Sequence, residues 1–109
     1  MKLVMAIVNR DDAERLTDAL TGEGFRATTA GTSGGFLRQG NTTILIGVAD
    51  EDVPRVIRLI RENCRTRTQL VSPMPPVMEP GEVYAPPLVE VQVGGATIFV
   101  LDVLQFEQV

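Results

Sequence analysis

Residues 34–48 read Gly-Gly-Phe-Leu-Arg-Gln-Gly-Asn-Thr-Thr-Ile-Leu-Ile-Gly-Val, a glycine-framed loop that runs into an apolar strand. Glycine lets a backbone come close to a ligand, and the ring of Phe36 offers a face on which a flat ring can stack. Arg38 adds a cation that can meet an anion. These are the parts of a nucleotide site, although the same glycines also fit a plain hairpin loop.

The glycine spacing of this loop is close to that of a phosphate-binding loop, but two requirements are missing. Asn41 stands where such a loop has its lysine. Residues 42–48 predict a β-strand at the place where a helix should begin and face the phosphates. The sequence therefore argues against ATP hydrolysis of the phosphate-loop type.

The strand at 42–48 belongs to a longer series of alternating elements. A capping-box pattern at Asp11 and Glu14 predicts the start of a first helix, and Asp50 with Pro54 predicts the start of a second. The pair Gly94-Gly95 predicts a two-residue hairpin between the last two strands. The expected strands cover residues 2–8, 25–30, 42–48, 88–93 and 96–101, and the expected helices cover roughly residues 11–22 and 50–63.

This order predicts an α+β, ferredoxin-like fold, the split β-α-β arrangement of PII-like proteins, with an extra C-terminal strand. Residues 1–109 are long enough for a single domain. A glycine-rich loop is expected at about 32–41. Residues 65–87 hold six of the seven prolines and predict a long proline-rich loop, which either serves a ligand or partner or is a plain surface excursion.

Composition narrows the class of protein. The formal net charge is −4, so no broad basic surface indicates nucleic acid or an anionic membrane. There is no histidine, only one lysine and one cysteine, which argues against an enzyme, a metal site or a disulfide. No long apolar segment indicates a signal peptide or a membrane span. We expect a soluble, cytoplasmic, non-catalytic binding protein with no cofactor.

Strand periodicity brings polar residues of two strands onto one surface. Arg26 and Thr28 share a face of their strand, and Asn41 and Gly47 share a face of the next. If these strands pair, the surface carries a cation, a hydroxyl, an amide and a gap without a side chain. An asparagine amide can match the hydrogen-bonding edge of adenine, and a phosphate would suit Arg26.

Each of these residues also has a simpler explanation. Arg26 fits a solvated strand charge, Thr28 is a good strand former, and Asn41 could end a loop. Gly47 is harder to explain, because glycine weakens a strand interior and often marks a close approach. An exposed Phe36, together with an apolar outer sheet face, points to an oligomer.

With these residues in view, the chain resembles the PII-like cyclic di-AMP receptor proteins of Gram-positive bacteria, nearly from end to end. The matching motifs are Gly34-Gly35-Phe36-Leu37, Gly40-Asn41-Thr42-Thr43, Ile46-Gly47-Val48, Val93-Gly94-Gly95-Ala96-Thr97, Val100-Leu101 and Gln105-Phe106 with Gln108.

The resemblance implies a homotrimer that binds cyclic di-AMP between neighbouring subunits and signals to an unknown downstream protein through its loops. The ligand-binding positions that it implies are Arg26, Ala27, Thr28, Gly35, Phe36, Leu37, Asn41, Gly47, Phe99 and Gln108. Two alternatives remain open, a PII-type trimeric regulator that binds ATP or ADP and a trimeric scaffold without nucleotide. Only Arg26 and Arg38 lie near the expected site, which favours two phosphodiester charges over a triphosphate.

Overall fold

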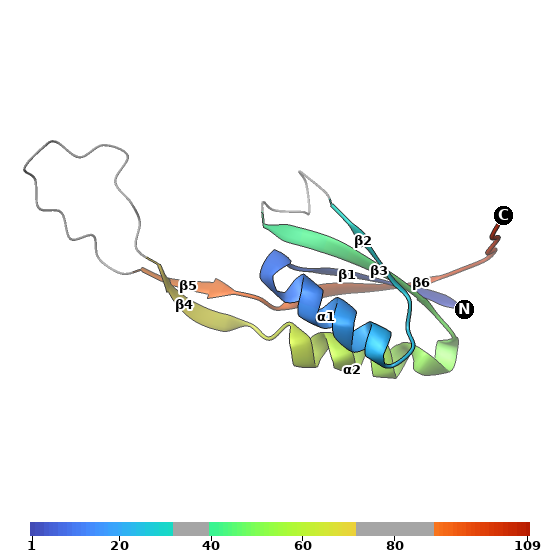
Figure 1. Cartoon of the computed structure of the whole chain (residues 1–109), viewed down its shortest axis with the longest axis horizontal. Coiled ribbons are helices and arrows are strands. Elements are labelled where there is room, and N and C mark those ends of the chain that lie inside the picture. The colour runs from blue at the N-terminus through green and yellow to red at the C-terminus, as the bar shows by residue number, and fades with distance from the viewer. Residues whose placement is uncertain (32–39, 72–88) are drawn as a thin grey trace, which may run out of the picture.

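The computed structural model describes residues 1–31, 40–71 and 89–109. These parts form two helices and an antiparallel sheet of four strands, with a second, two-stranded sheet at one end (Figure 1). The elements are β1 (Lys2–Asn9), α1 (Arg10–Gly22), β2 (Ala27–Ala30), β3 (Asn41–Val48), the 3-10 turn η1 (Asp50–Asp52), α2 (Val53–Asn63), β4 (Arg67–Val71), β5 (Val89–Val93) and β6 (Ala96–Asp102).

The larger sheet has the strand order β2-β3-β1-β6, and every neighbouring pair is antiparallel. The two strands that begin and end the first β-α-β unit are therefore separated by β3, which is compatible with the predicted ferredoxin-like arrangement. Both helices cover one face of this sheet (Figure 1). We call the opposite face the outer face.

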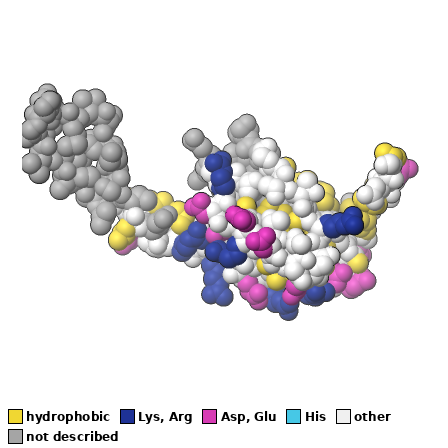
Figure 2. Space-filling model, viewed as in Figure 1, with side chains coloured by type: hydrophobic (Ala, Val, Ile, Leu, Met, Phe, Trp, Pro, Cys, Tyr) yellow, Lys and Arg dark blue, Asp and Glu magenta, His cyan; other side chains and the backbone are white. Residues whose placement is uncertain are grey.

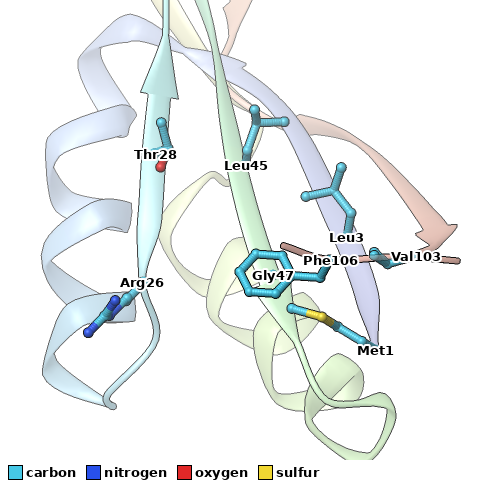
Figure 3. Close-up of a pocket in the computed structure, with 8 residues that line it drawn as sticks. All are labelled: Met1, Leu3, Arg26, Thr28, Leu45, Gly47, Val103 and Phe106. Atoms are coloured by element: carbon cyan, nitrogen blue, oxygen red, sulfur yellow. The ribbon is translucent and has the colours of Figure 1, made fainter. Parts of the chain in front are cut away.

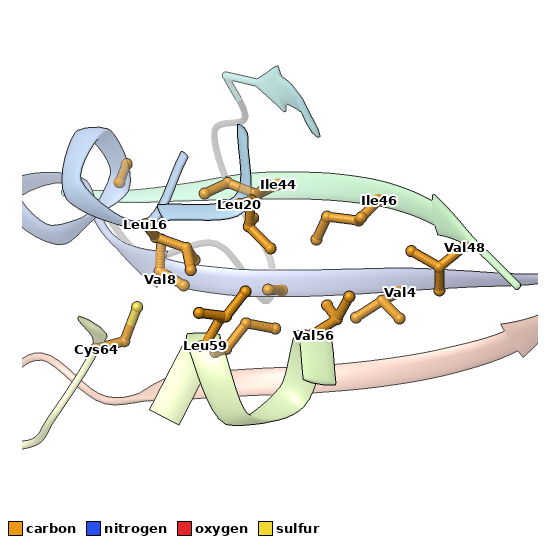
Figure 4. Packing of buried hydrophobic residues seen from close by; sticks show 13 residues of the cluster. Val4, Val8, Leu16, Leu20, Ile44, Ile46, Val48, Val56, Leu59 and Cys64 are labelled. Carbon is orange, nitrogen blue, oxygen red and sulfur yellow. The ribbon is translucent and has the colours of Figure 1, made fainter. Parts of the chain in front are cut away.

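Alternation along the strands produces the core between the sheet and the helices. Ile44, Ile46 and Val48 of β3 are buried against the helices, as the strand periodicity predicts. Leu16 of α1 and Val56 of α2 meet them there with no exposed surface (Figure 4). Burying each such side chain stabilises the fold by about 1.5–3 kcal/mol.

The helices begin at residues other than those that the local patterns predict. Asn9 caps α1, because its side-chain oxygen accepts a hydrogen bond from the amide of Asp11 at 2.8 Å, so the predicted box of Asp11 and Glu14 is wrong. Asp50 makes no capping hydrogen bond either. It lies in η1 and pairs with the terminal ammonium group, while Pro54 does lie in the first turn of α2.

The predicted hairpin around Gly94-Gly95 is also wrong. β5 pairs with β4, and β6 pairs with β1 in the larger sheet. Both glycines do have positive φ, 87° and 78°, as a tight hairpin turn would require. The two glycines therefore have the predicted turn conformation, but this turn connects β5 in one sheet to β6 in the other.

β4 and β5 form a two-stranded ribbon that projects from the body of the molecule (Figure 1). Below, "the ribbon" means Arg67–Val71 paired with Val89–Val93. Its first strand corrects the predicted proline-rich loop, because residues 67–71 are a strand and carry no proline. The remainder of that predicted loop, residues 72–87, lies outside the described residues.

Candidate functional site

A groove of about 470 Å³ opens on the outer face, at the end of the sheet where β1 begins (Figure 3). Its size falls in the range typical of small-molecule sites. The lining side chains are predominantly apolar, with one cation and one hydroxyl. They are Met1, Leu3, Arg26, Thr28, Leu45, Gly47, Val103 and Phe106.

Strand pairing builds the floor of this groove. Thr28 of β2 lies opposite Leu45 of β3, and Leu3 of β1 lies opposite Gly47. Directly opposed residues of antiparallel strands project to the same side, so these side chains reach the outer face together. Arg26 precedes β2 and joins Thr28 along one wall of the groove.

Gly47 leaves a gap in the groove floor that the backbone does not require. It lies inside β3 and is not among the described glycines with positive φ. A Cβ atom added there would come within 4 Å of one neighbouring atom alone among the described residues, Met1 Cε at 3.4 Å. Glycine at this place therefore keeps a space free above the strand rather than solving a backbone problem.

The opposite wall comes from the end of the chain. β6 pairs with β1, and just after β6 the amide of Val103 continues this pairing by donating to the carbonyl of Met1 at 3.2 Å. Phe106 follows, and its ring projects over Gly47 in Figure 3. This ring is 64% exposed, so one of its faces is available to a ligand.

Several charged groups lie at this end of the sheet, and one of their side chains, Arg26, lines the groove. Arg26 is exposed and forms no ion pair within residues 1–31, 40–71 and 89–109. By contrast, Asp50 Oδ1 lies 2.8 Å from the ammonium group of Met1. This hydrogen bond holds the pKa of Asp50 below its ordinary value. Lys2 pairs with Asp102 across β1 and β6, and this hydrogen bond raises the pKa of Lys2.

The groove unites three of the predicted ligand-binding residues, Arg26, Thr28 and Gly47. Asn41 lies on the same sheet face but six positions along β3 from Gly47, roughly 20 Å at the usual strand rise. Ala27 lies on the opposite face, partly buried against the core. A ligand that reaches both Asn41 and Gly47 must therefore extend along the sheet.

The other predicted residues lie farther from the groove or outside the described part. Phe99 of β6 is on the outer face, opposite Met5 of β1, and is 41% exposed. Gln108 is exposed in the C-terminal tail. The three glycine-loop positions, Gly35, Phe36 and Leu37, lie outside the described residues.

Sequence reasoning missed five lining residues, Met1, Leu3, Leu45, Val103 and Phe106. The periodicity already placed Leu45 on the same face as Gly47, so this residue could have been included. Leu3 required the register between β1 and β3, and Phe106 required the path of the tail. Neither is available from local sequence.

Within the described residues, no group of three or more His, Cys, Asp or Glu side chains is placed to hold a metal ion. None of the described helices is both long and apolar enough to cross a membrane. The groove itself offers an apolar floor, a guanidinium, a hydroxyl and an aromatic face, a set suited to binding a ligand with flat rings and negative charge.

Two comparisons with known proteins bear on the family and fold of this chain. The sequence matches the profile of the cyclic-di-AMP receptor family over residues 1–109. The chain belongs to the cyclic-di-AMP receptor family. A related solved structure is the crystal structure of a functionally unknown protein from Pediococcus pentosaceus, which is 42% identical and superimposes with a TM-score of 0.73. The match covers 99% of this chain and 96% of that protein, so the two proteins share one fold over practically the whole chain.

Proposed function

We propose that residues 1–109 act as one receptor domain that binds cyclic di-AMP, performs no catalysis and transmits binding to a partner protein. The groove on the outer face is the observation that carries this proposal. A purine base would lie in the space above Gly47, between the apolar floor and the ring of Phe106. The guanidinium of Arg26 would meet a phosphodiester charge, since this cation has no carboxylate partner among the described residues.

A buried hydroxyl farther along β3 supports a ligand that extends toward Asn41. Thr43 is 6% exposed, and its Oγ1 has no hydrogen-bond partner within the described residues. Buried polar groups normally have partners, because leaving one unpaired costs about 1–3 kcal/mol. A polar atom of the second nucleotide half would satisfy this hydroxyl on the way to Asn41 if binding first uncovered it, because Thr43 is buried.

The assembly proposed for this receptor is a homotrimer with a ligand at each subunit interface. An apolar strip on the outer face supports this arrangement. Met5 lies between Leu45 and Phe99, and Leu3 lies beside Leu101. Partly exposed apolar side chains gathered on one sheet face are typical of interfaces between protein chains. In a trimer, Phe99 and Gln108 would reach the ligand of a neighbouring subunit.

Signalling would follow from a change in loop conformation on binding, in the cytoplasm, with recognition by a downstream protein. A ligand shifts a conformational equilibrium only by binding one state more tightly. The glycine-rich loop at about 32–41 begins next to β2 and ends next to β3, the two strands that carry Thr28 and Gly47. The loop therefore joins the two strands that line the groove, at the end of the sheet where Asn41 lies.

An ATP- or ADP-binding regulator and a nucleotide-free trimeric scaffold are the competing functions. A triphosphate carries more charge than a single guanidinium can offset, and among the described residues Arg26 is the one charged side chain that lines the groove. A nucleotide-free scaffold would need only the apolar strip, as the contact between its subunits. The binding experiment separates the three.

Isothermal titration of the purified chain with cyclic di-AMP, cyclic di-GMP and ATP tests the proposal. We expect saturable binding of cyclic di-AMP alone. Arg26→Gln should weaken it by about tenfold or more, because a charge-assisted hydrogen bond is lost. Asn41→Ala should weaken it as well.

Arg61→Gln serves as the matched control, since Arg61 is exposed in the last turn of α2, across the sheet from the groove. Binding of ATP alone would move the chain to the nucleotide-triphosphate regulators. No binding of any of the three nucleotides would leave the scaffold function.

A further inference from the structure

A buried carboxylate at the start of α1 connects three elements at the end of the body from which the ribbon projects. The side chain of Asp12 is only 1% exposed, although aspartate is almost never fully buried unless it is paired. Arg15 Nη2 lies 2.9 Å from Asp12 Oδ1. Arg67 Nη1 lies 3.0 Å from the same oxygen and 3.2 Å from Oδ2. The carboxylate therefore accepts from α1 and from the first residue of β4.

Arg15 also connects this carboxylate to the end of α2. Arg15 Nη2 also donates to the backbone carbonyl of Asn63 at 2.7 Å, at the last residue of that helix. Carbonyls at a helix C-terminus lack partners within the helix, so this bond satisfies one of them. Asp12, through its two arginines, thus holds α1, the end of α2 and the base of the ribbon together. Figure 2 shows basic and acidic side chains gathered where the ribbon leaves the body.

Gly94 and Gly95 leave the room that this contact needs. A Cβ atom on Gly94 would lie 2.3 Å from the carbonyl oxygen of Arg65 and 2.8 Å from Arg67 Nη1, the nitrogen that bonds Asp12. A Cβ atom on Gly95 would lie 2.7 Å from Thr66 Oγ1. The second strand of the ribbon therefore leaves the body pressed against the segment that leads into the first.

The ribbon depends on its base for its orientation. β4 and β5 form ladder hydrogen bonds with each other and not with the larger sheet. An isolated two-stranded sheet is marginal in water. At this base, among the described residues, Arg67 makes two short charge-assisted contacts to the buried carboxylate of Asp12.

The first turn of α1 also contacts the end of the glycine-rich loop. The amide of Arg10 donates to the carbonyl of Gly40 at 2.8 Å. Arg10 and Asp12 are therefore two positions apart on one rigid turn, with the loop end bonded to the first and the ribbon base bonded to the second.

We propose that Asp12 anchors the ribbon through Arg67, and that the first turn of α1 couples the position of the ribbon to the end of the glycine-rich loop at Gly40. The anchor rests on contacts within one chain and requires neither a ligand nor a second subunit. Loosening the ion pair at Asp12 then loosens both the ribbon and the Arg10–Gly40 hydrogen bond, while the centre of the larger sheet is unaffected.

Residue-resolved amide hydrogen exchange of the full chain tests this anchor. In Asp12→Asn and in Arg67→Gln, we expect amides of β4 and β5 to exchange about tenfold faster, because a charged hydrogen bond becomes a neutral one. The amide of Arg10 should exchange faster too, and amides at the centre of β1 should not. Asp18→Asn is the matched control, an exposed acid on the same helix.

The double variant Asp12→Asn/Arg67→Gln distinguishes a shared contact from general destabilisation. If the two residues act through one ion pair, the double variant exchanges at nearly the rate of either single variant. The anchor would be overturned if the double variant multiplied the rate increases of the two single variants. It would also be overturned if exchange became faster throughout the chain, including in β1. If Asp12→Asn does not fold, Arg67→Gln and the conservative Arg67→Lys decide, with lysine expected to restore part of the ribbon protection. Faster ribbon exchange with an unchanged Arg10 amide would overturn the coupling to Gly40.

Discussion

Leu3 of β1 lies directly opposite Gly47 of β3, and a Cβ atom added to Gly47 would lie 3.4 Å from Met1 Cε. The side chain of Leu3 thus lies next to the space that Gly47 leaves free in the groove floor. Because no positive φ requires the glycine, a larger residue at this position should affect the groove and not the backbone.

Gly47→Val is expected to abolish or strongly weaken cyclic di-AMP binding, by about tenfold or more, because the side chain fills the space proposed for a base. The free energy of unfolding should stay the same or rise by up to about 1 kcal/mol, since valine suits a strand better than glycine does. Titration calorimetry and urea unfolding measure the two effects. Gly22→Ala, where an added Cβ meets nothing within 4 Å, is the control. Unchanged binding by Gly47→Val would remove this position from the site.

The outer face can be tested for self-association with two neighbouring residues of β6. Leu101 is 43% exposed on the outer face, and Val100 is 44% exposed on the helix side. Leu101→Glu should convert the proposed trimer to monomers, because a charge in an apolar interface is costly, whereas Val100→Glu should not. Light scattering after size-exclusion chromatography gives the mass of each. Equal masses for both variants would place the subunit contact elsewhere.

Cys64 predicts a specific dependence of stability on pH. The thiol is 3% exposed, and burial, assisted by the nearby Asp12 carboxylate, raises its pKa from about 9 to about 11. Below pH 9 the thiol is protonated in both states. Between these values the unfolded chain loses the proton and the folded chain keeps it, so stability falls as the pH rises.

The stability difference between wild type and Cys64→Ala should therefore shrink by roughly 2–3 kcal/mol between about pH 9 and pH 11. Urea unfolding at several pH values measures it. At pH 8, alkylation of native Cys64 by iodoacetamide should be much slower than in the unfolded chain, since the thiolate is the reactive form. A constant difference across this pH range would show that the folded thiol has an ordinary pKa.

Gly94 and Gly24 separate two costs of replacing a glycine. Both have φ near 88°, at 87° and 88°, but an added Cβ meets the Arg65 carbonyl at 2.3 Å in the first case and nothing within 4 Å in the second. Gly24→Ala should lose about 1–2 kcal/mol from the left-handed backbone alone. Gly94→Ala should lose clearly more and release the ribbon, as measured by unfolding and by amide exchange in β5. Equal losses would mean that the segment at Arg65 shifts easily.

The local pattern of apolar and polar residues determined the helices, most strands and the sheet face on which Arg26, Thr28 and Gly47 meet. Strand periodicity has a fixed value of two, so Ile44 and Ile46 had to face the core once Gly47 faced outward. The family resemblance carried by the glycine motifs was also readable, because motif spacing is a property of the sequence itself.

Only the tertiary structure decided that β5 pairs with β4 and what the C-terminal tail and the base of the ribbon contact. Gly94-Gly95 has the positive φ angles of a hairpin turn, yet β5 pairs with β4 and β6 pairs with β1. The two glycines lie close to Arg65 and Thr66, which come from a distant part of the chain. Two further contacts join residues that are far apart in sequence. Phe106 lines the same groove as Gly47, and Arg67 forms an ion pair with Asp12. Periodicity reports the environment of each residue along one element, whereas pairing across long loops is selected by packing and by buried charge, which no local pattern encodes.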